Sequence, residues 1–214
     1  FFNFTNLEEI KGLENLNSSE VTIMSGMFVD CEKLSQLNLS SFNTEKVQDM
    51  CAMFLDCSCL TSLNLSNFNT EKVENMLGMF YGCKSLSSLN ISSFNTEKVQ
   101  YMSGMFSGCS SLTSLNLSNF NTEKVENMHE MFCGCSSLSS LDLSNFNTEK
   151  VQDISGMFGN NTSLRTIYCN NTWTCALSDE MFYNCTSLKG AVKYNANKED
   201  ISMANPNTGY FTKK

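Results

Sequence analysis

The sequence predicts a mainly β protein wound as a solenoid of about seven coils of 26 residues. Two observations predict this fold: the dipeptide Met-Phe recurs at a fixed spacing, and other residue types keep the same period. The dipeptide begins at Met27, Met53, Met79, Met105, Met131 and Met157, each 26 residues after the last, and a seventh copy at Met181 follows after 24. Because one such unit buries too little apolar surface to offset its loss of chain entropy, the coils must stack on one another.

One unit of the repeat reads M-F-x-x-C-x-x-L-x-x-L-N-L-S-x-F-N-T-E-K-V-x-x-M-x-x. Within it, Leu63-Asn64-Leu65 alternates apolar and polar residues, which predicts a half-buried strand. Residues 72–76 predict a second extended stretch, and residues 78–83 predict a short helical or 3-10 turn. The leucine spacing makes this a solenoid of the leucine-rich-repeat type.

The ends of the chain depart from the repeat, as the ends of a solenoid must if they are to cover apolar faces and strand edges. We expect an N-terminal cap and partial coil over residues 1–26, the solenoid proper over 27–189, and a C-terminal cap over 190–214. The sequence predicts no linker and no second domain.

Charge and composition exclude some classes of partner. The chain has 14 Lys and Arg against 22 Asp and Glu, a net charge of −8, which disfavours nucleic acid. No stretch approaches the roughly 20 apolar residues of a spanning helix, so we expect no membrane insertion by this segment.

The run Met-Phe-x-x-Cys-x-x-Leu-x-x-Leu-Asn-Leu-Ser-x-Phe-Asn-Thr-x-Lys-Val-x-x-Met resembles the 26-residue repeat of BspA-like leucine-rich-repeat proteins, the bacterial surface protein repeat. The resemblance extends to the C-terminal end, through Met181–Gly190 and Gly209–Thr212. It implies a right-handed β-solenoid at the cell surface or secreted, with a role in attachment to host or matrix proteins. It implies no catalytic motif, and the extra cysteines of this chain depart from the commoner pattern.

Cysteine fills one column of the repeat. Its members are Cys31, Cys57, Cys83, Cys109, Cys135 and Cys185, and Asn161 takes the same slot once. Residues in register point the same way, so we expect buried free thiols rather than disulfides, and thiolates spread along a line rather than around a metal. Cys169 and Cys175 flank an irregular segment, where either a disulfide or two reduced thiols would fit.

Enzyme chemistry is not expected, and neither is a cofactor or metal. The only histidine, His129, occupies a variable slot, and although Cys133 lies four residues later, no orienting group recurs around the pair.

Partner recognition is expected where the repeats differ from one another. The variable slots hold Leu55, Leu77, Tyr81, Tyr101 and His129, and the two tyrosines resemble interface anchors. Neutral variation on a tolerant surface explains the same pattern, and the Asn column that begins at Asn38 either stabilises the sheet or binds a protein or glycan.

Two functions therefore remain open. One is a surface-displayed or secreted module for protein binding and adhesion, with a protein or glycan ligand from a host or matrix. The other is a structural protein that self-associates by end-to-end or thiol-linked stacking.

Overall fold

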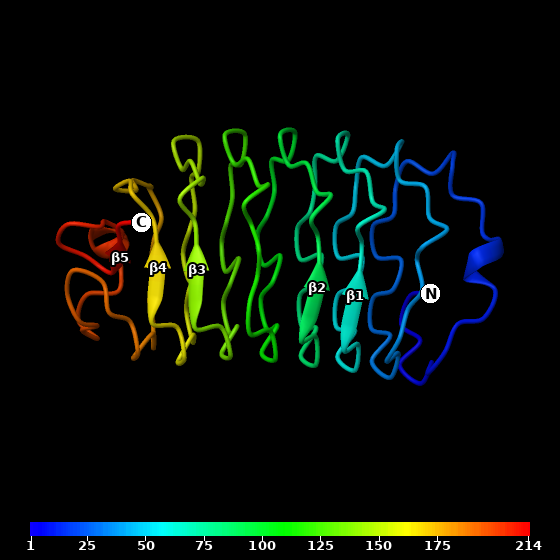
Figure 1. Ribbon diagram of the computed structural model, residues 1–214, viewed down its shortest axis with the longest axis horizontal. Coiled ribbons are helices and arrows are strands. Elements are labelled where there is room, and N and C mark those ends of the chain that lie inside the picture. Colours follow the sequence, from blue (N-terminus) through cyan, green and yellow to red (C-terminus); the bar gives the residue numbers. More distant parts are fainter.

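The computed structural model describes residues 1–214 and winds the whole chain into one elongated stack of coils (Figure 1). Along one side run the strands β1 (Ser62–Asn64), β2 (Ser88–Asn90), β3 (Ser140–Asp142), β4 (Thr166–Tyr168) and β5 (Phe211–Thr212). β1 pairs with β2, and β3 pairs with β4 and then β5, all in parallel. Leu63 lies opposite Leu89, 26 residues on, which confirms the predicted period and the mainly β solenoid.

The strands follow directly from the alternation in the sequence. Leu63 points inward and is 3% exposed, whereas Ser62 and Asn64 on either side face solvent. Each strand is at most three residues long, because the chain must turn within one coil to return to its starting side.

A second parallel ladder forms the opposite wall. It consists of single-residue bridges between successive coils, through Ile23, Asp49, Asn75, Tyr101, Asn127, Asp153 and Leu177. The predicted extended stretch at 72–76 therefore pairs at one residue only.

The turn after this ladder differs from the prediction. Residues 78–83 form consecutive tight turns instead of a helix, and the two 3-10 helices, η1 (Leu13–Asn15) and η2 (Ile201–Met203), lie in the terminal regions. The reason is that every second amide in this segment bonds to the next coil: Gly78 donates to Ser103 and Phe80 to Met105. A helix would direct those amides along its own axis. Neither helix in the structure is long and apolar enough to cross a bilayer.

The core is a set of stacked columns. Phe28, Phe54, Phe80 and Phe106 are fully buried, and their ring centroids lie 5.6 Å apart along the axis. The same column continues through Phe132 and Phe158 at spacings of 5.7 and 6.0 Å. Offset stacking of this kind adds to the burial of apolar surface. The fixed core therefore sets the spacing of every surface column.

The terminal segments continue these ladders. Phe1 stacks on Phe28, and the Asn3 amide donates to the Val29 carbonyl. At the other end β5 adds a strand to β4, and the Tyr210 hydroxyl donates to the Lys198 carbonyl.

Candidate partner-binding surface

The cysteine column lies inside the solenoid. All six members are 0% exposed, and each thiol donates to a backbone carbonyl of the preceding coil, for example Cys57 to Phe28 at 3.0 Å and Cys135 to Phe106 at 3.0 Å. Burial raises the pKa of Cys57 and Cys135 to about 12, so both remain protonated at neutral pH. These thiols are structural, and a buried protonated thiol is a poor nucleophile.

Asn161 makes the same contact with a different group. Its side-chain amide donates to the carbonyls of Phe132 at 2.8 Å and Phe158 at 2.7 Å, while its own Oδ1 is buried without a partner. The amide thus replaces the thiol as donor, as expected for this slot.

Cys169 and Cys175 are free thiols in the structure, so the disulfide considered for them is absent. Cys169 donates to the Asn171 carbonyl at 3.5 Å and Cys175 to the Val151 carbonyl at 3.2 Å. The two thiols point to different partners, which explains why the irregular segment is held without a bridge.

His129 lies between two carboxylates. Its Nε2 is 3.7 Å from Glu130 Oε1, and its Nδ1 is 3.8 Å from Asp153 Oδ2. Its side chain is 45% exposed. Burial raises the pKa of the nearby Cys133 thiol, which is unlike an activated nucleophile, and no cluster of metal-ligating side chains exists in the structure.

The remaining candidate residues come together on the second wall. Leu77, Tyr81 and Tyr101 are 42%, 40% and 42% exposed. The Tyr81 ring lies so close to Gly104 that a Cβ added to this glycine would be 3.3 Å from Tyr81 Cδ2, and Leu55 lies against Gly78 in the same way at 3.8 Å. We call Leu55, Leu77, Tyr81 and Tyr101 the apolar strip; it crosses three neighbouring coils, and His129 lies on the coil beyond it.

Glycine makes this arrangement sterically possible. The slot before each Met-Phe requires a positive φ, +57° at Gly78 and +59° at Gly104, and the missing Cβ leaves room for the side chain from the preceding coil. The strip therefore depends on glycines that the repeat pattern alone did not connect with it.

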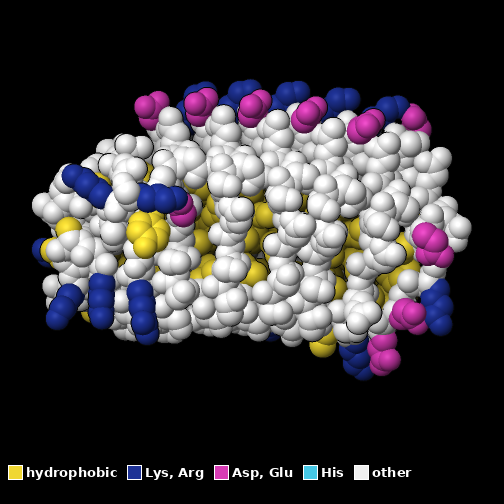
Figure 2. Space-filling view, viewed as in Figure 1, with side chains coloured by type: hydrophobic (Ala, Val, Ile, Leu, Met, Phe, Trp, Pro, Cys, Tyr) yellow, Lys and Arg dark blue, Asp and Glu magenta, His cyan; other side chains and the backbone are white.

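The other faces are polar. Asn90 donates to Asn64 at 3.2 Å along the outer strand face, and Asn64 also accepts from its own Ser66 amide. Charged side chains of both signs line one long edge, and the strand face between the edges is largely uncharged (Figure 2). Of the Glu and Lys columns on that edge, Lys46 alone forms an ion pair, with Glu20 at 2.7 Å.

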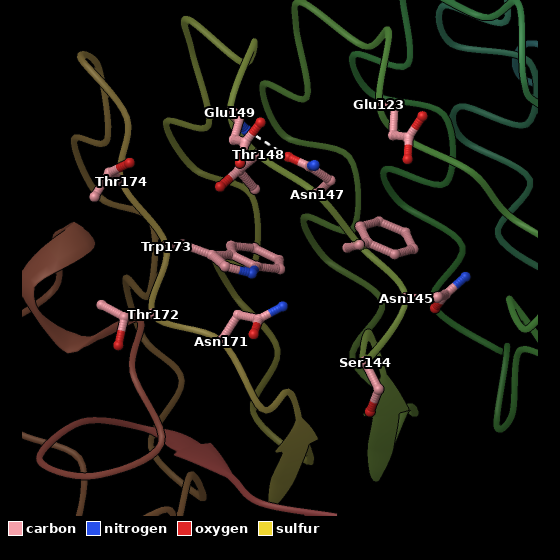
Figure 3. A pocket seen from close by; sticks show the side chains of 11 residues that line it. Glu123, Ser144, Asn145, Asn147, Thr148, Glu149, Asn171, Thr172, Trp173 and Thr174 are labelled. Atoms are coloured by element: carbon pink, nitrogen blue, oxygen red, sulfur yellow. Dashed lines mark hydrogen bonds between the residues drawn. The ribbon is translucent and has the colours of Figure 1, made fainter.

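One cavity was not predicted from the sequence. It has a volume of about 610 Å³ and lies between residues 144–149 and residues 171–174, with Glu123 at its border. Figure 3 shows Trp173 between these two polar segments. The only signal in the sequence is the 24-residue spacing before Met181, which marks a coil two residues short.

These features define a repeat protein: a leucine-rich-repeat-type solenoid with a fixed core and variable outer columns. The chain belongs to the family described as "Mycoplasma protein of unknown function, DUF285", whose model matches residues 1–114 and 83–196. No curated protein sequence matches the chain.

Three solved structures are similar to it. A leucine-rich-repeat protein of T. pallidum shares 20% identity over 64% of this chain and 57% of its own, with a TM-score of 0.44. One from Bacteroides ovatus shares 17% identity over 87% of this chain and 61% of its own, with a TM-score of 0.44. A leucine-rich cell surface protein of Faecalibacterium prausnitzii shares 18% identity over 62% and 36%, with a TM-score of 0.32. The chain thus spans less than two thirds of each of these proteins.

Proposed function

We propose that this chain is a non-enzymatic binding module of a bacterial leucine-rich-repeat protein, displayed at the cell surface or secreted, and that it attaches to a protein or glycan partner of host or matrix origin. The observation that carries the proposal is the apolar strip. Large apolar side chains that lie exposed and contiguous on a rigid surface are typical of interfaces, whereas single exposed ones are common everywhere.

The scaffold supports this role physically. The strip is attached to turns whose amides bond to the next coil, such as Gly78 to Ser103 at 2.8 Å and Gly104 to His129 at 2.7 Å. Side chains on such a rigid frame lose little entropy on binding, which favours affinity.

The test is a binding screen against immobilised matrix proteins and glycans, followed by the double variant Tyr81→Ala/Tyr101→Ala. We expect at least a tenfold loss of affinity for the partner found, with an unchanged melting temperature. Tyr183→Ala is the matched control, because Tyr183 occupies the Tyr81 column at the C-terminal end and is 47% exposed. A double variant that binds as well as the unmodified protein contradicts the proposal.

Self-association is the second candidate. At the N-terminal end Phe2, Phe4 and Ile23 are 67%, 55% and 65% exposed. The carbonyls of Ile23 and Ser25 accept no backbone hydrogen bond there, whereas the equivalent Asp49 and Cys51 accept from the preceding coil. This edge supports stacking of chains, and exposed Cys59 supports a thiol link.

Light scattering with and without reductant separates the candidates. A concentration-dependent increase in mass supports assembly, and loss of the larger species on reduction supports thiol linkage. A monomer under both conditions contradicts assembly.

A further inference from the structure

The turns after the first strands are joined by a repeated hydrogen-bond pair. In five coils a hydroxyl donates to the carbonyl and accepts from the amide of one Asn, 25 residues on: Thr122 donates to the Asn147 carbonyl at 2.8 Å, and the Asn147 amide donates back at 2.8 Å. The same pair links Ser18 to Asn43, Thr44 to Asn69, Thr70 to Asn95 and Thr96 to Asn121. Each of these hydroxyls thus binds one peptide unit.

Thr148 has the same position but no such partner. The residue 25 positions on is Trp173, whose amide donates instead to the Ala204 carbonyl at 3.0 Å. Thr148 is 7% exposed and its hydroxyl makes no hydrogen bond within the protein, although it lines the cavity of about 610 Å³. A buried hydroxyl without a partner is costly, and the cavity gives a ligand access to it.

A second group at this place is also open. Asn145 donates to the carbonyls of Leu117 and Phe120, and Asn67 and Asn119 do the same one coil after their own targets. The next member of this column, Asn171, makes no such bond, so the Phe146 carbonyl has no partner. The cavity therefore presents one hydroxyl suited to a secondary amide and one carbonyl suited to a donor.

The walls narrow the class of ligand. Trp173 stacks on Phe146 with ring centroids 6.4 Å apart, so the apolar floor is already filled and the open space is polar. Nine of the eleven lining residues are polar, and they supply hydroxyls and carboxamides together with the carboxylates of Glu123 and Glu149. Such carboxylates disfavour anions and accept hydrogen bonds from hydroxyl groups.

We propose that this cavity binds an acetamido sugar, with the N-acetyl amide taking the place of the missing peptide unit on Thr148. The amide N–H donates to Thr148 Oγ and its carbonyl accepts from the same hydroxyl, while a sugar hydroxyl donates to the Phe146 carbonyl. The volume lies in the usual range for small-ligand sites, roughly 300–1,000 Å³. The site uses no residue of the apolar strip, so it stands or fails separately from the proposed partner-binding surface.

The test is calorimetric titration of the full chain with N,N′-diacetylchitobiose, and with cellobiose, which carries hydroxyls where chitobiose carries acetamido groups. We expect chitobiose to bind at least tenfold more tightly than cellobiose. Thr148→Val should weaken chitobiose binding at least tenfold and leave the melting temperature unchanged, because no internal hydrogen bond is lost.

Thr122→Val is the matched control. It removes a hydroxyl whose two hydrogen bonds lie inside the protein, so the melting temperature should fall and chitobiose binding should stay as in the unmodified chain. Equal affinity for the two sugars, no chitobiose binding at millimolar concentration, or unchanged binding by Thr148→Val overturns the proposal. Tighter binding of an acetylated Asn-Phe-Asn-Thr peptide than of chitobiose also overturns it, in favour of a peptide site.

Discussion

Replacing Glu130 by glycine should stabilise the solenoid. Glu130 has a φ of +52°, in the left-handed region, at a slot that holds glycine in four other coils with φ between +57° and +63°. A residue with a Cβ pays roughly 1–2 kcal/mol for this conformation, and glycine does not. The repeat fixes the conformation here because the Glu130 amide donates to the Ser155 carbonyl at 2.9 Å.

The opposing terms are smaller. The contact between Glu130 Oε1 and His129 Nε2 is 3.7 Å long, with both side chains about 40–45% exposed, so its loss costs at most about 1 kcal/mol. Glycine also gains entropy in the unfolded chain, about 0.5–1 kcal/mol in an ordinary position. We therefore expect a net gain of about 0.5–1 kcal/mol, or about 1–4 °C in melting temperature for a chain of this size.

Circular dichroism melting and urea unfolding measure this gain. Glu126→Gly is the matched control: Glu126 lies in the same coil, its amide also bonds to a neighbouring coil, and its φ is not positive. We expect Glu126→Gly to lower stability by about 0.5–1 kcal/mol. If Glu130→Gly lowers the melting temperature as much as Glu126→Gly does, the left-handed slot does not carry the strain assigned to it.

The remaining predictions concern the core, the thiols and the cap. Phe106→Ala, in a fully buried ring stacked on both sides, should cost about 3–5 kcal/mol in urea unfolding; a loss below 1 kcal/mol would mean that the column does not set stability. Native thiol alkylation read by mass spectrometry should modify exposed Cys59 first and spare the buried column, and equal rates would contradict the burial. Because burial raises the pKa of Cys57 and Cys135 from 9.0 to about 12, stability should be complete below pH 9 and fall between pH 9 and 12, as thiols ionise in the unfolded chain alone; a flat urea midpoint over that window would contradict this. Gly209→Ala would place a Cβ 2.1 Å from the Met203 carbonyl oxygen, so limited trypsin digestion at Lys198 should accelerate, and an unchanged rate would show that the cap yields without unfolding.

The coil architecture could be predicted from the sequence because a stacked solenoid has one dominant constraint. Identical residues must lie over one another, so the 26-residue spacing fixed the pairing of Leu63 with Leu89 before any local structure was considered. The burial of the cysteine column followed from the same register, since its members share one environment.

Local conformation was less predictable. The segment from Gly78 to Cys83 has the composition of a helical turn, but amides committed to the next coil force alternating turns with positive φ at Gly78 and Gly82. Inter-coil bonding thus overrides local preference. The cavity beside Thr148 was missed for a related reason: a coil two residues short shows that a ladder is interrupted, but not which hydroxyl loses its partner.

A regular stack limits where such a protein can bind anything. Thr122 and its counterparts have their hydrogen-bonding capacity filled by the next coil, and the core columns are covered on both sides, so a perfect repeat offers a ligand little beyond a uniform edge. Binding energy must come from departures: a large side chain over glycine, as with Tyr81 over Gly104, or a ladder that ends early, as at Thr148. The two departures differ in chemistry, one apolar and convex, the other polar and concave. They are therefore expected to serve different ligands, and variants in one should leave binding at the other unchanged.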